Sequence, residues 1–257
     1  MKTKELCVVE SQQEISRGIF SLWIKTDTIA ANAVPGQFVS LFCKDGSRLL
    51  PRPISLCEID KEGGRLHLVY RVAGGGTKEF STLRSGEQIS VMGPLGNGFP
   101  LKEAAGKKVF LMGGGIGVPP MLECAKQIAG EVQIILGYRD VTFLKDDFEK
   151  AGKVYIATED GSSGVKGNVM DAVCEYGLNA DLIFACGPKP MLRAIQLYAQ
   201  KNHIPCWISM EERMACGVGA CLGCVCKSTE RDDHSQVNHK RVCKDGPVFP
   251  ASEVDLT

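Results

Sequence analysis

The sequence predicts an antiparallel β barrel, followed by a doubly wound α/β domain and a small cysteine-rich module. In the first hundred residues, short runs of β-branched and aromatic residues alternate with turn residues, which is typical of a small barrel. From Lys108 onward, apolar strand patterns alternate with helical patterns, which indicates a parallel sheet. Five of the twelve cysteines lie between Cys216 and Cys243. We expect three units with the bounds 1–100, 101–210 and 211–257.

The barrel strands are expected at CVVE, IFSLWIK, QFVSLFC, ISLCEI, RLHLVYRV and QISVMG. Two segments between them have the chemistry of a phosphate or flavin site. Arg52-Pro53-Ile54-Ser55 offers a guanidinium for phosphate, a stiffened backbone and a hydroxyl that can bond a flavin ring nitrogen. Gly74–Thr77 is a glycine loop before the helical pattern KEFSTL, with Thr77 as the expected N-cap. Taken alone, each segment also fits a surface ion pair or a hairpin turn.

The α/β pattern predicts a sheet of order 3-2-1-4-5, with right-handed crossovers. In that order the first and fourth strands are neighbours, and their C-terminal ends flank a ligand crevice. Glycine-rich turns follow both strands, at GGGIGVPP and CGPKPM. Pro120 stands where the dinucleotide fingerprint has its third glycine, so the first turn departs from that motif. The expected nucleotide-site residues are Gly114, Gly115, Gly117, Pro119, Cys186, Gly187 and Pro188.

The end of the second strand of this domain, Tyr138-Arg139-Asp140, is where an adenosine ribose is normally recognised. Asp140 suits the free hydroxyl of NAD, whereas Arg139 suits the 2′-phosphate of NADP. NAD is favoured, because no second basic residue is adjacent.

The cysteine-rich module carries the most specific pattern. Cys216, Cys221 and Cys224 are separated by four and then two residues, and Cys243 follows after eighteen more. This spacing is that of plant-type ferredoxins, which hold a 2Fe–2S cluster on four thiolates. The glycines between these cysteines let the loop curl so that sulfur atoms and backbone amides face one centre. Cys226 is a fifth candidate. We rank it below Cys243, because it lies only two positions from Cys224, which is too close for both of these thiols to ligate comfortably.

Two other interpretations of these cysteines remain open. Cys221 and Cys224, followed by His234 and His239, resemble a zinc finger, although the intervening segment lacks an apolar helix face. A disulfide framework is disfavoured, because MKTKELCVVE lacks the apolar core of a signal peptide and twelve cysteines suit a reducing cytoplasm. The formal net charge is zero and no basic stripe is present, which argues against a nucleic-acid partner. No apolar run approaches the roughly 20 residues of a membrane span.

Together, RPIS, GGGT, GGGIGVPP, CGPKPM and the cysteine loop resemble the ferredoxin–NADP reductase superfamily across the whole chain. Within it, EERMACGVGACLGCVCK and VCKDGPVF resemble the electron-transfer subunits of class B dihydroorotate dehydrogenases. The resemblance implies FAD on the barrel, NAD on the α/β domain and a 2Fe–2S cluster on Cys216, Cys221, Cys224 and Cys243. The implied FAD contacts are Arg52, Pro53, Ile54, Ser55, Val69, Tyr70, Arg71, Gly76 and Thr77.

The same resemblance implies a function in pyrimidine biosynthesis. Electrons from dihydroorotate would enter at the FMN of a separate catalytic subunit, in a complex of two plus two chains, and leave on NAD+ through the cluster and FAD. FAD stands between the other carriers because it exchanges both electron pairs and single electrons. No orotate site is recognisable in this chain, so a partner is required. The alternatives are a reductase subunit for ferredoxin, sulfide or sulfite chemistry, and a zinc-binding protein without catalytic activity.

Overall fold

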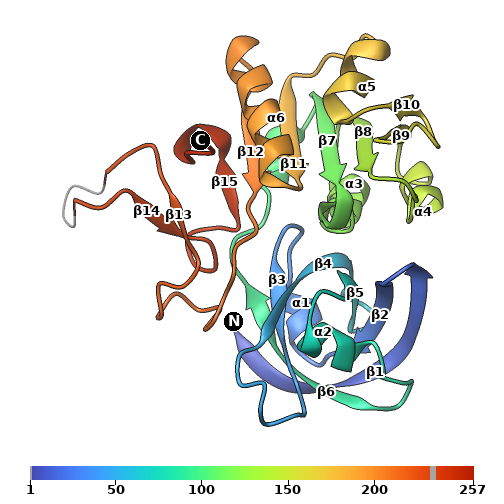
Figure 1. The fold of residues 1–257 in the computed structure, drawn as a ribbon, viewed down its shortest axis with the longest axis vertical. Coiled ribbons are helices and arrows are strands. Elements are labelled where there is room, and N and C mark those ends of the chain that lie inside the picture. Colours follow the sequence, from blue (N-terminus) through green and yellow to red (C-terminus); the bar gives the residue numbers. More distant parts are fainter. Residues whose placement is uncertain (1, 232–235) are drawn as a thin grey trace.

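The computed structural model describes residues 2–231 and 236–257. Figure 1 shows the barrel below the α/β sheet, with the C-terminal hairpin extending to one side. The closed barrel has the strand order β1-β2-β5-β4-β3-β6, with neighbouring strands antiparallel. Its strands are β1 (Thr3–Ser16), β2 (Ile19–Lys25), β3 (Phe38–Phe42), β4 (Arg52–Asp60), β5 (Arg65–Arg71) and β6 (Gln88–Leu95). The predicted barrel is confirmed.

The barrel closes around alternate side chains of its strands. Leu22, Ile24, Leu66 and Leu68 are fully buried, as the period-two pattern of a half-buried strand requires. Two short helices, α1 (Ile29–Asn32) and α2 (Gly75–Phe80), lie in the loops between strands. These side chains form a core of the barrel's own, so the domain has an independent source of stability.

The α/β domain has the strand order β10-β9-β8-β7-β11-β12-β15. Its parallel strands are β7 (Lys108–Gly114), β8 (Glu131–Tyr138), β9 (Lys153–Thr158), β10 (Val165–Lys166), β11 (Leu182–Cys186) and β12 (Cys206–Ser209). The order 3-2-1-4-5 is therefore confirmed, because β9, β8, β7, β11 and β12 are the third, second, first, fourth and fifth strands of the predicted alternation.

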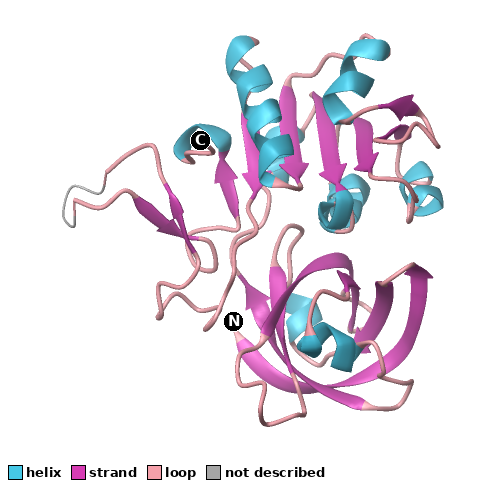
Figure 2. Cartoon of the chain, in the orientation of Figure 1, coloured by secondary structure: helices cyan, strands magenta, loops and turns pink. Residues whose placement is uncertain are grey.

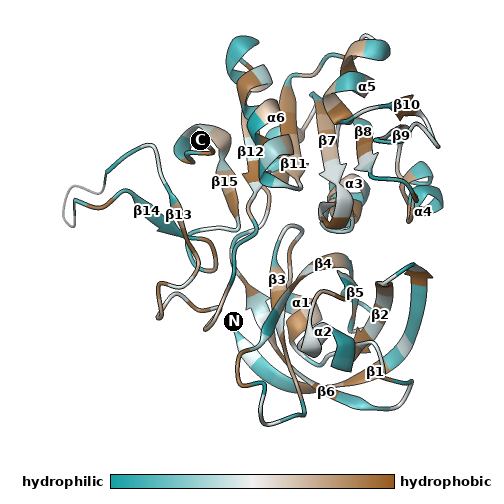
Figure 3. Cartoon of the chain, in the orientation of Figure 1, coloured by the Kyte–Doolittle hydropathy of each residue, from teal (hydrophilic) through white to brown (hydrophobic). Residues whose placement is uncertain are grey.

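Helices cover both faces of this sheet (Figure 2), and hydrophobic residues concentrate along β7, β11 and β12 (Figure 3). The helices are α3 (Pro120–Gln127), α4 (Lys145–Glu149), α5 (Val169–Glu175) and α6 (Lys189–Lys201), with 3-10 turns η1 (Leu101–Ala104), η2 (Gly115–Gly117) and η3 (Ala251–Glu253). Within the described ranges, no helix combines the length and apolar character that crossing a membrane would require.

The C-terminal module is built on a hairpin of β13 (Val225–Lys227) and β14 (His239–Arg241). The chain then returns to the α/β domain, where β15 (Val248–Pro250) pairs antiparallel with β12. The end of the chain also contacts the module, since the Asp255 amide donates to the Lys227 carbonyl at 2.9 Å. The last residues therefore join the cysteine module to the larger sheet.

One local expectation in the barrel was wrong. Thr77 is not an N-cap, because helix α2 begins at Gly75 and Gly74 occupies the cap position. Thr77 lies inside the first turn, and its Oγ1 accepts hydrogen bonds from the Ala73 and Gly74 amides at 2.9 and 3.1 Å. The hydroxyl thus satisfies amides before the helix, which lets the helix start earlier than its side chains suggested.

Candidate functional site

A cavity of about 410 Å³ opens where the barrel, the first glycine turn and the segment after β12 meet. Such a volume is in the range of small-molecule and cofactor sites. Seven of the residues expected to contact FAD line it: Pro53, Ile54, Ser55, Val69, Tyr70, Arg71 and Thr77. They come together because β4 and β5 are neighbours in the barrel. The sequence patterns did not predict that β4 and β5 lie side by side.

Tyr70 lines the cavity with its ring, while its hydroxyl is engaged elsewhere. The hydroxyl donates to Gln12 Oε1 at 2.9 Å, and Gln12 Nε2 in turn donates to the Phe80 carbonyl at 2.9 Å. Burial raises the pKa of the Tyr70 phenol far above its usual range. The Tyr70 phenol is therefore neutral, and its hydrogen bond to Gln12 fixes the ring that lines the cavity.

Arg52 and Gly76 lie against each other at the edge of this cavity. A Cβ added to Gly76 would lie 2.3 Å from Nε of Arg52, so only glycine lets the guanidinium come this close to the loop backbone. Arg52 also donates to the Leu50 carbonyl. A fixed guanidinium beside a glycine backbone is suited to the phosphates of a nucleotide.

The two glycine-rich turns of the α/β domain meet, as expected. Strands β7 and β11 are neighbours, with Gly113 paired to Cys186. A Cβ on Gly117 would lie 2.5 Å from the Cys186 carbonyl oxygen, and one on Gly114 would lie 3.3 Å from Cδ of Pro188. Gly115 has a φ of +54°, in the left-handed region. The contact between the turns therefore depends on the absence of side chains.

The Cys186 side chain is fully buried, and burial raises its pKa far above the usual value for a thiol. Cys186 is not among the residues that line the described cavity. Gly187 is buried and Pro188 is exposed at the turn. A nicotinamide contact of Cys186 stays a prediction.

The sequence interpretation missed several cavity residues, namely Phe38, Ala73, Ile116, Met210, Glu211, Glu212, Met214 and Pro247. Glu211 is the most informative of these: the residue is exposed at the cavity, but partial removal from water still raises the pKa of its carboxyl, and the nearby Arg71 charge opposes that rise. The available signal was the acidic pair EE directly before the cysteine loop. Nothing local to that pair, however, indicates that it returns to the barrel.

The cysteine loop turns backbone amides toward its sulfur atoms. The Val218 and Ala220 amides donate to Sγ of Cys216 at 3.4 and 3.3 Å. The Gly223 amide donates to Sγ of Cys221 at 3.4 Å. Amide donors of this kind stabilise negative charge on thiolate ligands and their clusters.

Cys224 and Cys243 form the other half of this arrangement. Both are buried, and the Cys243 amide donates to Sγ of Cys224 at 3.4 Å. Burial raises the pKa of the Cys243 thiol, and the neighbouring Cys224 adds to this rise. For Cys216, the hydrogen bonds from backbone amides outweigh burial and lower the pKa of the thiol. The four cysteines thus form two contacting pairs, because the Cys216 and Cys221 side chains also bond. Four thiols with surrounding amides fit a 2Fe–2S cluster.

Cys226 lies on β13 with its backbone paired to Lys240, and it is buried among apolar residues. Burial also raises its pKa. The choice of Cys243 over Cys226 as fourth ligand stays a prediction. Of the two histidines in the zinc alternative, His239 lies exposed on β14 and His234 lies outside the described residues.

The cysteine loop and the cavity are adjacent. Met214 lines the cavity two positions before Cys216. A Cβ on Gly217, which has a φ of +69°, would lie 3.0 Å from Oγ of Ser40 on barrel strand β3. The loop therefore packs directly on the barrel. A cluster held there would lie beside the cavity.

Two family models match the chain. Residues 6–99 match the oxidoreductase FAD-binding domain. Residues 211–255 match the iron-sulfur cluster binding domain of dihydroorotate dehydrogenase B. The two models thus cover the barrel and the cysteine module.

The chain is also similar over its whole length to curated proteins. It is 44% identical over 264 residues to the dihydroorotate dehydrogenase B (NAD(+)) electron transfer subunit of Bacillus cereus strain B4264, with 100% of both chains covered. The Bacillus anthracis protein of the same name is 43% identical with the same coverage.

Among solved structures, an NADH-dependent reduced ferredoxin–NADP oxidoreductase matches with a TM-score of 0.87 and 29% identity, covering 98% of this chain and 90% of that chain. Amycolatopsis cytochrome P450 reductase GcoB matches with a TM-score of 0.65 and 21% identity, covering 78% of this chain and 66% of that chain. The second match supports the fold alone.

Proposed function

This chain belongs to the family of dihydroorotate dehydrogenase B (NAD(+)) electron transfer subunits, and from that membership we propose that it carries electrons between a catalytic partner subunit and NAD in pyrimidine biosynthesis. The observation that carries the proposal is the adjacency of three sites in one chain. The cysteine loop packs on the barrel, the cavity lies beside it, and the first glycine turn borders that cavity through Ile116.

When bound, FAD would exchange electron pairs with NAD and single electrons with a 2Fe–2S cluster. The chain's own residues hold and orient these groups. Ser55 on β4 would offer a hydroxyl to the flavin ring, and Arg52, which lies beside Gly76, would offer its positive charge to the pyrophosphate. Val69, Tyr70 and Arg71 form the second wall, and Thr77 borders the cavity from α2.

On the α/β side, the backbone of Gly114, Gly115 and Gly117 would admit the NAD phosphates, and Pro119 is the N-cap of the following helix, α3. Asp140, directly after β8, would accept a hydrogen bond from the ribose hydroxyl, which favours NAD over NADP. Cys216, Cys221, Cys224 and Cys243 would hold the cluster.

The catalytic partner would contain FMN and supply electrons from dihydroorotate, in a cytoplasmic complex of two plus two chains. The exposed side chains of Val218 and Leu222 support a docking partner near the cluster loop, since they are 40% and 61% exposed. All twelve cysteines are free thiols, as suits the cytoplasm.

Co-purification of the chain with its partner tests this function. We expect a complex that contains FAD, FMN, iron and acid-labile sulfide and that reduces NAD+ with dihydroorotate. A colourless chain that carries zinc would contradict every redox function for it.

A second candidate is a reductase subunit that serves ferredoxin. It is favoured by the similarity to the NADH-dependent reduced ferredoxin–NADP oxidoreductase. The two functions separate in one assay, because electron delivery from NADH to ferredoxin without an FMN partner supports only the second.

A further inference from the structure

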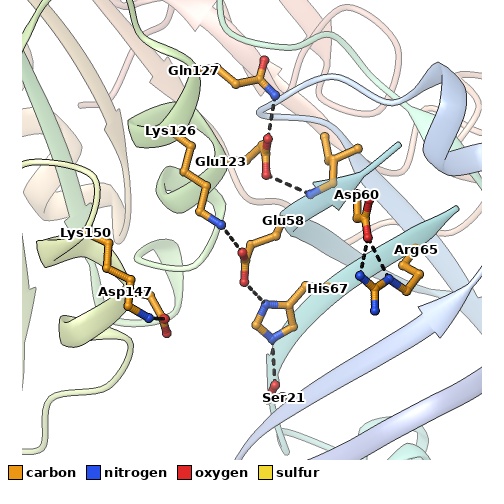
Figure 4. A network of polar contacts seen from close by, with 11 residues as sticks. Ser21, Glu58, Asp60, Arg65, His67, Glu123, Lys126, Gln127, Asp147 and Lys150 are labelled. Carbon is orange, nitrogen blue, oxygen red and sulfur yellow. Dashed lines mark hydrogen bonds and ion pairs between the residues drawn. The ribbon is translucent and has the colours of Figure 1, made fainter. Parts of the chain in front are cut away.

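Strand β4 loses one of its barrel neighbours halfway along its length. Its pairing with β3 ends at Ser55, and its register with β5 shifts between Leu56 and Glu58. Beyond this point, no barrel strand in the described part of the chain pairs with one backbone edge of β4. Helix α3 of the α/β domain lies against that edge (Figure 4).

Helix α3 supplies the acceptor that this edge lacks. Glu123 is only 6% exposed, and its Oε2 accepts a hydrogen bond of 2.8 Å from the Ile59 amide. Its Oε1 accepts from Nε2 of Gln127 at 2.6 Å, which fixes the carboxylate. A buried backbone amide needs such a partner, because water cannot reach it. The contact therefore resists separation of the two domains.

A second chain of polar contacts crosses the same boundary. Lys126 of α3 pairs with Oε2 of Glu58, whose Oε1 lies 2.7 Å from Nδ1 of His67. Nε2 of His67 lies 2.7 Å from Oγ of Ser21. The ring of Trp23 stacks on His67 with centroids 4.6 Å apart. On the barrel side of this boundary, these contacts thus join three strands, β4, β5 and β2.

Cys57, Glu58 and His67 also bring three potential metal ligands within 4.8 Å of one another. Both ring nitrogens of His67 and both carboxylate oxygens of Glu58 are already bonded within the protein. These groups therefore serve the domain contact and do not make a case for a metal ion.

The elements joined by these contacts carry the two nucleotide segments. Helix α3 begins at Pro120, directly after the η2 turn, and its eight residues span about 12 Å. Strand β4 begins with Arg52 and carries Ser55 into the cavity. Contacts along α3, from Glu123 in its first turn and from Lys126 near its C-terminal end, therefore constrain the distance between the glycine turn and the flavin segment.

We propose that Glu123 and Lys126 are positioning residues that hold the NAD phosphate turn at a fixed distance from the flavin-facing segment of β4. The reaction affected is hydride exchange, in which two electrons and one proton move together between nicotinamide and flavin. This inference rests on the proposed function. A displacement of about 1 Å at a reacting centre can slow a reaction about 100-fold, so the contact matters even though it lies away from the chemistry.

The test uses the holoprotein with its partner and compares Glu123→Ala, Glu123→Gln and Lys126→Met. Glu123→Gln keeps a carbonyl acceptor for the Ile59 amide and should behave as the wild type. Glu123→Ala should reduce flavin with NADH about 10- to 100-fold more slowly at saturating NADH, with FAD and iron contents unchanged. Hydrogen–deuterium exchange of the peptide that contains Ile59 should rise in the same variant.

Lys150→Met is the matched control, because the ion pair that Lys150 makes among the described residues joins it to Asp147 on α4 at 2.9 Å (Figure 4). Unchanged rates in Glu123→Ala together with faster exchange at Ile59 would reduce the contact to a structural role and overturn the proposal. If Glu123→Ala does not fold, Lys126→Met decides, since it leaves the Ile59 amide bonded: a rate within twofold of wild type overturns the proposal. If NADH does not reduce the flavin of the wild-type holoprotein, that result instead contradicts the proposed function.

Discussion

The amide of Cys243 lies 3.4 Å from Sγ of Cys224, although the two residues are 19 positions apart. The hydrogen bond joins the returning segment after β14 to the short loop that holds the other three thiols. It brings Cys243 beside Cys224, and it gives Cys224 an amide donor. We therefore expect the four thiols to be preorganised as ligands of one cluster.

Cys221→Ser should abolish the iron–sulfur cluster and leave FAD in place. Cys221 is exposed and makes its described sulfur contacts inside the loop, so the barrel should not be disturbed. We expect iron and acid-labile sulfide to fall to background while NADH still reduces artificial dyes. Cys174→Ser, at another exposed cysteine, is the control and should keep its iron. Loss of dye reduction in a folded variant would show that the cluster does not lie downstream of FAD.

Cys243→Ser and Cys226→Ser separate the two candidates for fourth ligand. Cys243→Ser should lose the cluster, because the thiol that contacts Cys224 is removed. Cys226→Ser should keep it, at a stability cost of about 1–3 kcal/mol for burying a hydroxyl. Visible absorption spectra, iron contents and denaturant unfolding measure these outcomes. Retention of the cluster in Cys243→Ser with loss in Cys226→Ser would reverse the assignment.

Ser55→Ala should slow flavin reduction by NADH about 10-fold or more, because a hydrogen bond to the reacting ring is lost. Ser55 lines the cavity from the end of the β3–β4 pairing, so the change removes one hydroxyl and leaves the strand intact. Stopped-flow spectra give the rate, and FAD and iron contents should match those of the wild type. Unchanged kinetics would mean that Ser55 does not touch the reactive nitrogen.

Gly117→Ala should weaken NAD binding while leaving FAD binding intact. The new Cβ would lie 2.5 Å from the Cys186 carbonyl oxygen, so the two glycine turns must move apart. We expect a stability loss of about 1–3 kcal/mol from the overpacking. Calorimetric titration with NAD+ measures the affinity. Gly46→Ala, where the added Cβ meets nothing within 4 Å, should leave both properties unchanged.

Glu58 should make stability depend on acidity. Burial acts to raise its pKa, but hydrogen bonds from His67 and Lys126 outweigh this and lower it to about 2. Since the folded-state pKa lies below the unfolded one, the contribution is present above about pH 4.5 and is lost as the pH falls toward 2. After a discount for solvent screening, we expect a contribution of about 1–2 kcal/mol. Denaturant unfolding of wild type and Glu58→Gln should show a difference that is constant near pH 7 and shrinks below pH 4.5.

The local patterns predicted much of this fold for a physical reason. Strand and helix periods reflect which side chains face a core, and that signal lies within a few residues of each position. The order of β9, β8, β7, β11 and β12 is a common order of doubly wound sheets, the class that the βα alternation indicates. Thr77 shows the limit of local reasoning, since its hydroxyl bonds backwards and the helix begins before it.

Three units, the spacing of Cys216, Cys221 and Cys224, and the glycine turns could all be predicted from the sequence, because each depends on contacts between near neighbours in the chain. The return of Glu211 and Met214 to the barrel cavity, and the bond from Glu123 to the edge of β4, could be seen only in three dimensions. Those contacts join residues far apart in sequence, and their partners depend on how two independently folded cores pack. No spacing within the chain encodes that packing.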